Sequence, residues 1–261
     1  MAVVITSVST KGGVGKTTLC KFLSVVKARE GKKVLIIDIC QNSDIATRLG
    51  YDRESFVYTS YEFLTDEKNE IKLEDIIQHD EETGVDFIPS GPRIDKYQEY
   101  VNGVRPVGPE KEFERKIKTL ADRYDYILID NHPTETNQMI FYSLCASDIA
   151  LIPTLTDISS ILATDRTLKL IKSLNKYDVP VKPVVVPTAV DFTKGLGKYA
   201  EKMKDEFESA TVLSPIRYSS KMNTDGLEGK IIDLENKYIK KVVEDYEQVS
   251  RELDALLNPI A

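Results

Sequence analysis

Cysteine is scarce in this chain of 261 residues, which has three cysteines, Cys20, Cys40 and Cys145. None of them stands in C-x-x-C spacing, so the sequence favours neither a zinc site nor an iron–sulfur site. A sparse, odd number of cysteines without a signal peptide is typical of a reduced, cytosolic protein. No apolar run approaches the roughly 18–20 residues that a membrane-spanning helix needs, so we expect no such helix. Tryptophan is also absent, which excludes no class of function.

Basic residues are outnumbered, with 35 Lys and Arg against 42 Asp and Glu and a formal net charge of −7. This average argues against a protein coated in basic surface, although a local basic patch stays possible because binding depends on where charge lies. Residues 66–86 are notably acidic, with nine Asp or Glu and two Lys. We expect a solvated surface helix and loop there. The alternative is a docking surface for a basic partner.

Strand-like and helix-like segments alternate along the chain. The apolar runs VLIID (34–38) and YILID (126–130) are typical of strands buried on both faces of a parallel sheet. Further strands are expected at 3–9, 85–90, 148–153 and 181–187, and helices at 16–29, 110–123, from about 135, 159–174, 194–207 and 236–257. This rhythm predicts a single α/β domain with a mostly parallel, twisted sheet and helices on both faces.

The segment TKGGVGKTT (10–18) joins the first expected strand to the first expected helix, which is the setting of a phosphate-binding loop. Its glycines let the backbone approach a phosphate and turn N–H groups inward, and the helix N-terminus adds positive potential. Lys16 is expected to reach the β- and γ-phosphates, Thr17 to ligate Mg²⁺ and Thr18 to contact the α-phosphate. The loop residues predicted to bind nucleotide are Gly12, Gly13, Val14, Gly15, Lys16, Thr17 and Thr18.

Two aspartates come at the ends of the buried strands. Asp130 ends the strand at 126–130, at the carboxyl edge of the sheet, where ligands bind in open α/β folds. We expect it to hold Mg²⁺ through water. Asp38 ends the strand at 34–38 and is expected to orient the Mg²⁺-bound or attacking water. The predicted metal site is therefore Thr17, Asp38 and Asp130.

The run KGGVGKTT resembles the deviant Walker A motif of the ParA/MinD family of ATPases, and the chain is most like a small, single-domain partition ATPase of the ParA type. Residues 34–50, 124–154, 184–191 and 229–232 are similar, in the same order, to later motifs of the family. The resemblance implies a P-loop NTPase that uses ATP and Mg²⁺, with Thr188 near the adenine. It also implies that Lys11 reaches across a homodimer interface to the phosphates held by the other subunit. Because the loop starts ten residues in, we expect no N-terminal helix-turn-helix domain within 1–261.

The chain departs from the family at Cys40, where the second motif of the family has an aspartate linked to activation of the attacking water. The pKa of an ordinary thiol is about 8.5, and a nearby triphosphate should disfavour the thiolate further. Cys40 is therefore a poor substitute for a carboxylate. Either Asp44 supplies the missing acid, or hydrolysis is slow and water is positioned by Asp38 or Asn42. The predicted catalytic residues are Lys11, Lys16, Asp38 and Asp44.

The resemblance also implies partners. ATP-bound dimers of the family hold DNA without sequence preference through basic residues, and a ParB-like or ribbon-helix-helix adaptor stimulates hydrolysis. Residues 192–241 hold ten Lys or Arg but also eight Asp or Glu, so any basic patch must form through folding and dimerisation. We expect a cytoplasmic protein associated with the nucleoid. The candidate DNA-binding residues are Lys194, Lys198, Arg217, Lys221 and Lys230.

Three other functions are compatible with the sequence. One is a MinD-like positioning ATPase at a membrane or scaffold, but residues 236–257 carry four Lys or Arg against five Asp or Glu. Because membrane-surface helices are rich in Lys and Arg, we expect this helix to pack against the domain. Another is a metabolic enzyme, such as a dethiobiotin-synthetase-like ligase, which should have a pocket for a small carboxylate. The third is a nucleotide-binding switch that hydrolyses slowly because of Cys40.

Overall fold

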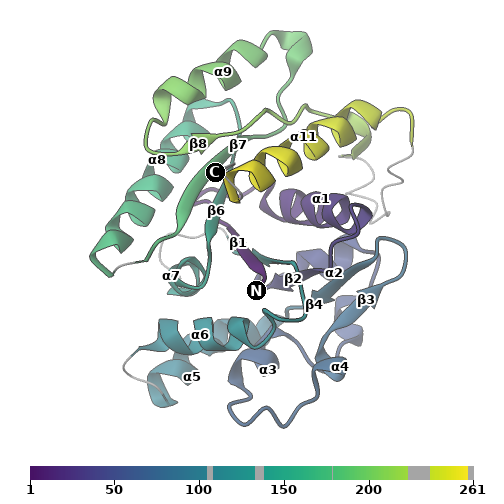
Figure 1. Cartoon of the computed structure of the whole chain (residues 1–261), viewed down its shortest axis with the longest axis vertical. Coiled ribbons are helices and arrows are strands. Elements are labelled where there is room, and N and C mark those ends of the chain that lie inside the picture. Colours follow the sequence, from purple (N-terminus) through teal and green to yellow (C-terminus); the bar gives the residue numbers. More distant parts are fainter. Residues whose placement is uncertain (105–107, 133–137, 178, 223–235, 258–261) are drawn as a thin grey trace.

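The computed structural model describes residues 1–104, 108–132, 138–177, 179–222 and 236–257. An eight-stranded sheet of strand order β3-β4-β2-β5-β1-β6-β7-β8 runs through the middle of the molecule (Figure 1). Every pairing in it is parallel except that of β3 with β4. The strands are β1 (Val3–Ser7), β2 (Val34–Asp38), β3 (Gln78–Asp80), β4 (Val85–Ile88), β5 (Tyr126–Asp130), β6 (Ile149–Thr154), β7 (Lys182–Pro187) and β8 (Thr211–Val212).

Helices connect most of these strands. The α-helices are α1 (Lys16–Arg29), α2 (Asp44–Arg48), α3 (Ser60–Thr65), α4 (Leu73–Ile76), α5 (Tyr97–Val104), α6 (Pro109–Lys118), α7 (Gln138–Cys145), α8 (Ile158–Ser173), α9 (Gly197–Glu206) and α11 (Lys240–Leu257). Four 3₁₀-helices are described, η1 (Arg53–Ser55), η2 (Pro92–Lys96), η3 (Leu174–Tyr177) and η4 (Phe192–Lys194). The predicted α/β architecture is therefore confirmed.

The sheet is covered on both faces, which explains its continuous apolar strands. Val34 and Ile36 pack into the core on one face, with residues of α1, α2 and α11. Leu35 and Ile37 point to the opposite face, where α3, α5, α6 and α7 pack. Alternate residues of β6 and β7 meet α8 and α9 on that second face. Both faces are therefore buried, as expected for a parallel sheet.

The register of the central strands brings the predicted site residues together. Asp38 at the end of β2 pairs with Asp130 at the end of β5, and Asp130 pairs in turn with Ser7 at the end of β1. The segment after Ser7 is the predicted phosphate loop. Three adjacent carboxyl ends thus meet at one edge, where parallel sheets bind their ligands.

Two helix predictions differ from the structure at their first turn. The helix predicted at 194–207 is split, because Gly195 takes a left-handed conformation (φ 70°) that ends η4 before α9 begins at Gly197. The helix predicted at 236–257 begins at Lys240. Residues 133–137, where another helix was expected to start, lie outside the described residues, and α7 begins at Gln138.

The acidic segment 66–86 is more ordered than a solvated helix and loop. It contains α4, the edge strand β3 and the start of β4. Asp80 accepts hydrogen bonds from the Tyr51 and Thr83 hydroxyls, and Asp86 accepts one from the Tyr124 hydroxyl. Part of this acidic charge therefore serves the fold.

The last described helix, α11, packs against the domain as predicted, and Figure 1 shows it lying along α1. Val242, Val249 and Leu253 are buried in the core on that face of the sheet. The rings of Tyr246 and Phe22 stack with their centroids 4.8 Å apart. The apolar stripe of α11 is therefore already covered. None of the helices within the described ranges is long and apolar enough to cross a membrane.

Candidate functional site

The loop between β1 and α1 has the backbone that phosphate binding requires. Gly13 and Gly15 take positive φ values of 74° and 99°, a region that residues with a Cβ atom rarely adopt. Val14 between them is 1% exposed and anchors the loop in the protein. The Thr188 hydroxyl donates a hydrogen bond to the Val14 carbonyl over 2.8 Å, so the segment after β7 also supports the loop. Gly12 lies at the exposed tip.

Lys16 begins α1 and is only 6% exposed. Its Nζ atom donates a hydrogen bond to the backbone carbonyl of Lys11 over 3.3 Å, so the side chain folds back over the loop. Burial lowers the pKa of Lys16, and the nearby Asp130 carboxylate opposes that shift. The ammonium therefore lies in its own loop, as expected for a group that meets the phosphates there. Thr17 and Thr18 follow it and are half-buried.

Lys11 points away from this loop. Its Nζ atom lies 2.9 Å from Oδ1 of Asp157, and it also donates hydrogen bonds to the hydroxyls of Ser159 and Ser160 over 2.6 and 2.8 Å. Asp157 caps α8 by accepting from the Ser160 N–H. Burial opposes the charged form of Asp157, but hydrogen bonds from Ser159, Ser160 and Lys11 hold its pKa below the usual range. The two lysines of the loop thus have separate environments.

Asp130 is fully buried, yet no hydrogen bond from the described residues reaches either of its carboxylate oxygens. Burial raises its pKa to about 6, an effect that the adjacent Thr17 hydroxyl and the Lys16 ammonium partly offset. A buried carboxylate without partners is costly unless a cation or donor meets it. Asp130 and Thr17 therefore fit a divalent cation whose remaining ligands are water and phosphate, the usual way in which proteins bind Mg²⁺.

Asp38 is also fully buried, but its oxygens are engaged. Oδ1 accepts a hydrogen bond from the Cys40 N–H over 2.8 Å, and Oδ2 accepts one from the Ile45 N–H over 3.1 Å. Burial, together with the neighbouring Asp130, raises the pKa of Asp38 well above its usual range. In this structure Asp38 holds the loop between β2 and α2, a role that the sequence did not predict.

Cys40 lies in that loop and is 3% exposed. Burial, and then the Asp38 carboxylate, raise the pKa of its thiol to about 12. This direction agrees with the prediction of a neutral thiol at this position. Asp44, the first residue of α2, is half-buried, and its charge acts on Lys16, Asp38, Cys40 and Asp130. Asp44 is thus close enough to affect the site electrostatically.

The candidate DNA-binding residues differ in their surroundings. Lys194 is exposed, and its Nζ atom lies 3.3 Å from Oδ2 of Asp191. The ammonium of Lys198 lies 5.2 Å from the centre of the Tyr199 ring. Arg217 donates two side-chain hydrogen bonds to Asp245 of α11, over 2.6 and 2.8 Å, and a third from its backbone. Lys221 is half-buried, and Lys230 lies outside the described residues.

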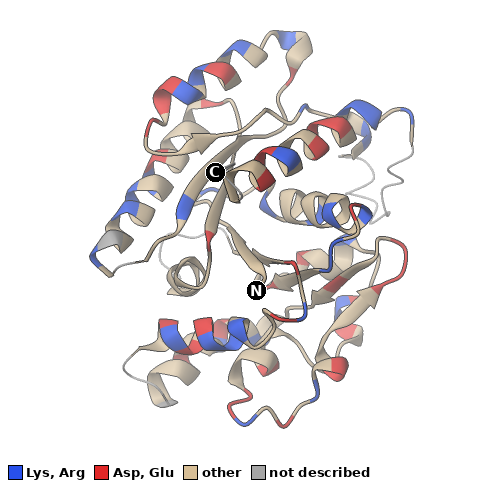
Figure 2. Ribbon diagram, viewed as in Figure 1, with Lys and Arg blue, Asp and Glu red and all other residues tan. Residues whose placement is uncertain are grey.

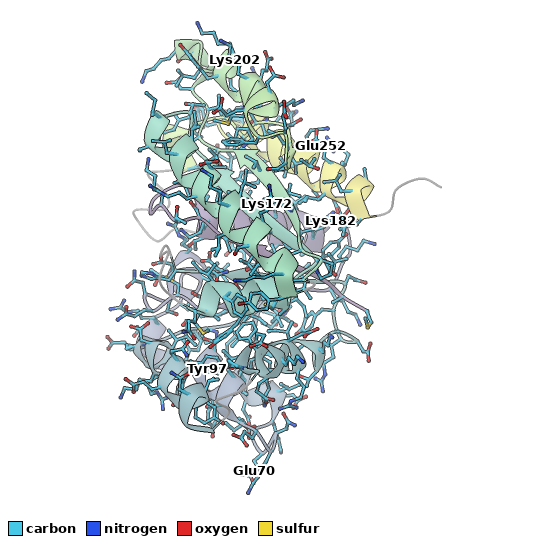
Figure 3. All side chains as sticks on the ribbon, turned by 90° about the vertical axis from the view of Figure 1, so that its left-hand side faces the viewer. Glu70, Tyr97, Lys172, Lys182, Lys202 and Glu252 are labelled. Carbon is cyan, nitrogen blue, oxygen red and sulfur yellow. The ribbon has the colours of Figure 1, made fainter. Side chains whose placement is uncertain are left out.

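Charge is mixed around these candidates. Figure 2 shows Lys and Arg alternating with Asp and Glu along α9 and α11. Further cations lie on the face turned toward the viewer in Figure 3, where Lys172 is seen on α8 and Lys202 on α9.

A cavity of about 370 Å³ lies beside the β2–α2 loop. Two guanidinium groups face it, but they are matched by carboxylates, because Glu54 lines the same cavity and Arg93 lies 2.9 Å from Glu62. Because the positive and negative groups are balanced, the cavity has no preference for a small carboxylate. It therefore does not favour the hypothesis of a metabolic enzyme. It is lined by Gln41, Asn42, Ser43, Arg53, Glu54, Phe56, Thr59, Ser90, Gly91, Pro92 and Arg93.

Residues 2–182 match the model of a family described as AAA domain. The chain belongs to this family. It is 26% identical over 238 residues to the sporulation initiation inhibitor protein Soj of Bacillus subtilis, covering 90% of this chain and 91% of Soj. Together with the phosphate loop, the similarity to Soj and to the ParA family protein MG470 of Mycoplasma genitalium supports a P-loop ATPase of the ParA/MinD type.

Solved structures confirm the fold. Apo McdA of Cyanothece superposes with a TM-score of 0.82 at 23% identity, covering 97% of this chain and 100% of McdA. Cobyrinic acid a,c-diamide synthase of Mycobacterium smegmatis, with bound ADP and magnesium, gives a TM-score of 0.80 at 19% identity, covering 99% and 95%. One architecture thus serves both a protein of carboxysome distribution and a biosynthetic enzyme. Function must therefore be argued from the site.

Proposed function

We propose that this chain is a DNA partition ATPase of the ParA type. ATP binding closes a homodimer, the dimer holds DNA without sequence preference, and hydrolysis stimulated by a ParB-like or ribbon-helix-helix adaptor releases it. The observation that carries the proposal is the separation of the two loop lysines. Lys16 lies over its own loop, whereas the partly exposed ammonium of Lys11 is bonded to α8. A second lysine that leaves its own phosphates uncontacted is suited to those of another subunit.

The buried edge of the sheet supports ATP and Mg²⁺ as cofactors. The unpartnered oxygens of Asp130 and the hydroxyl of Thr17 would hold Mg²⁺ together with the phosphates of ATP. When bound, Mg²⁺ neutralises charge that develops on the β- and γ-phosphates. The inward N–H groups of the loop and Lys16 would bind those phosphates, and the segment at Thr188 would border the base.

Hydrolysis requires that water attack the γ-phosphorus while the bond from that phosphorus to the bridging oxygen breaks, giving ADP and phosphate. In this chain the thiol of Cys40 is neutral and cannot accept the proton of the water. Asp38 has both oxygens bonded to backbone N–H groups. Asp44 is the nearby carboxylate that remains for this task, and Asn42 could orient the water without accepting its proton. We therefore propose slow basal turnover that depends on Asp44.

DNA retention would use phosphate contacts from exposed lysines, chiefly Lys194 and Lys198. Such contacts need no base recognition, and they weaken as salt concentration rises. Because these lysines are interspersed with acidic residues, one subunit would bind DNA weakly. Two copies held in a dimer would double the number of contacts, which links DNA retention to ATP. A protein retained in this way would be found on the nucleoid.

A positioning ATPase at a membrane is the second candidate function, and the packing of α11 argues against it. Its apolar stripe is covered by α1, so this helix has no free apolar face to insert into lipid. Pelleting with anionic liposomes in the presence of ATP tests this reading directly. We expect the protein to stay in the supernatant.

The experiment that tests the main proposal measures retention on nonspecific DNA with ATP, with ADP and without nucleotide, for the wild type, Lys11→Ala and Lys16→Ala. The wild type should retain DNA at low salt with ATP alone. Lys16→Ala should lose both ATP binding and DNA retention, whereas Lys11→Ala should bind ATP but fail to dimerise and to retain DNA. If all three proteins bind DNA regardless of nucleotide, the switch does not exist.

A further inference from the structure

Two lysines of α1 are buried outside the phosphate loop. Lys21 and Lys27 are 5% and 2% exposed. Lys27 makes ion pairs with Glu30 and Asp254, at 3.1 and 2.6 Å. The ammonium of Lys21 instead donates a hydrogen bond to the backbone carbonyl of Arg48, the last residue of α2. A buried cation thus joins the helix that begins at the phosphate loop to the helix that begins at Asp44.

The helix α2 depends on such external bonds. It has five residues, far fewer than the roughly 12–15 that an isolated helix needs for marginal stability in water. At its first turn no side chain caps the backbone from Ser43, and Asp38 accepts the Ile45 N–H instead. At its last turn the carbonyls of residues 45–47 accept backbone N–H groups from residues 49–51, whereas the Arg48 carbonyl accepts from Lys21.

Burial of the Lys21 ammonium costs free energy of folding. A methionine would fill a similar volume in this core without the penalty of burying an ammonium. Burial and the Arg48 guanidinium lower the pKa of Lys21 to about 8, while Asp80 of β3 and Glu82 in the turn after it oppose the shift. The neighbouring positions Phe22, Leu23 and Val25 are apolar, as the core requires. The hydrogen bond to α2 is therefore the best explanation for a charged donor at position 21.

We propose that Lys21 is a positioning residue for ATP hydrolysis, fixing the C-terminal end of α2 so that Asp44, at the other end, is held toward Asp130 and Lys16. The inference rests on the proposed ATPase function. The helix α1 carries Lys16 at its start and Lys21 five residues later, so one helix connects the phosphate loop to the end of α2. Asp38 fixes the first turn of α2 and Lys21 fixes the last.

The test compares Lys21→Met with Lys27→Met, a matched change of a second buried lysine in the same helix that does not contact α2. Steady-state ATPase is measured together with amide hydrogen exchange over residues 40–48, with and without Mg²⁺-ATP. Lys21→Met should lower kcat about tenfold with KM unchanged, the scale of one lost charge-assisted hydrogen bond. It should also speed exchange over 40–48 while exchange over 12–18 stays as in the wild type. Lys21→Arg, which keeps a charged donor, should restore most of kcat.

Two results would overturn the inference. One is wild-type kcat and wild-type exchange over 40–48 in Lys21→Met. The other is an equal loss of kcat in Lys27→Met, since that would reflect lower stability in general. A double variant gives a further check, because Lys21→Met should lower kcat no further in an Asp44→Ala background. If the wild type binds ATP without turning it over, the ATPase proposal fails, and the exchange data still decide whether Lys21 holds α2.

Discussion

The Nζ atom of Lys11 lies 2.9 Å from Oδ1 of Asp157, the residue that caps α8. Both side chains belong to one subunit, and the hydroxyls of Ser159 and Ser160 complete the set of acceptors around the ammonium. The lysine that we propose to reach across a dimer interface is therefore bonded within its own subunit. Closure of the dimer has to break these bonds, so their strength opposes it.

The first prediction concerns Asp157→Asn. Asparagine keeps the N-cap acceptor of α8 but removes the charge that holds Lys11. The side chains of Lys11 and Asp157 are 30% and 47% exposed, so we expect the pair to contribute about 0.5–1 kcal/mol. Because each of the two subunits loses one such pair, the ATP-dependent dimer should form at about 5- to 30-fold lower protein concentration, measured by sedimentation with a nonhydrolysable ATP analogue. Asp165→Asn, which removes the partner of Lys169 on the same helix, should change nothing. Weaker dimerisation of Asp157→Asn would instead give Asp157 a role inside the dimer.

The second prediction concerns Asp130→Asn, which should raise stability and abolish function. The folded-state pKa of about 6 lies above the ordinary value of 3.8, so stability from this group is present at low pH and is lost as pH rises through 6. At pH 7 the charged carboxylate is buried, and the nearby Thr17 hydroxyl and Lys16 ammonium offset only part of the cost, so its removal should stabilise the nucleotide-free protein by on the order of 2 kcal/mol. Thermal unfolding without nucleotide should show the gain. Mg²⁺-dependent ATP binding should be lost in the same variant, and a stability loss instead would mean that Asp130 has a structural partner.

The same carboxyl group predicts a pH dependence. Mg²⁺ binds the deprotonated form, so the Mg²⁺-dependent part of ATP affinity in the wild type should rise as pH increases through about 6. Titrations of a fluorescent ATP analogue between pH 5 and 8, with and without Mg²⁺, measure it. Affinity without Mg²⁺ is the control for the titration of the phosphates themselves. A flat Mg²⁺ contribution across this range would exclude Asp130 as the titrating group.

The phosphate loop and the strand-end aspartates could be predicted from sequence because local signals determine them. Gly13 and Gly15 mark the required backbone, and the apolar run before Asp130 marks a buried strand whose end lies at the carboxyl edge. The neutral state of Cys40 could also be predicted, because burial and neighbouring negative charge both act against a thiolate.

The partners of the site residues could not be predicted. Lys11 and Asp157 are separated by 146 positions in the chain, and Arg217 and Asp245 by 28. Which side chains meet across such distances depends on how helices pack on the sheet, and hydrophobic periodicity specifies only which face is buried. The D-x-S-S pattern at 157–160 signals a helix N-cap, but not that a lysine of the phosphate loop lies above it.

The fourth prediction separates Arg217 from the lysines proposed to contact DNA. Arg217→Ala leaves Asp245, which is 13% exposed, without its cation. It should lower the free energy of unfolding by about 1–2 kcal/mol, less than for a fully buried pair because a third of the Arg217 side chain is exposed. Lys198→Ala should leave stability unchanged but weaken ATP-dependent DNA retention and reduce its salt dependence by about two counterions per dimer. Chemical denaturation and DNA retention across a salt series measure the two effects. Arg217 belongs with the DNA-binding residues if its replacement changes the salt slope without changing stability.

The last prediction uses Cys40 to decide how this chain hydrolyses ATP. A positioned base accelerates such a reaction by about 10²–10⁴-fold, and the neutral thiol of Cys40 cannot supply one. If Asp44 supplies only a small part of that acceleration, Cys40→Asp should raise basal kcat at least tenfold. Cys40→Asn, which introduces an uncharged side chain of the same size as aspartate, should not. The added carboxylate lies near Asp38 and Asp130, so like-charge repulsion should lower the stability of the nucleotide-free protein. Colorimetric phosphate release and thermal unfolding measure these two effects. If Cys40→Asp leaves kcat unchanged and Asp44→Ala abolishes it, Asp44 already does the work of the missing aspartate, and the substitution at position 40 has moved the base by four residues without slowing the enzyme.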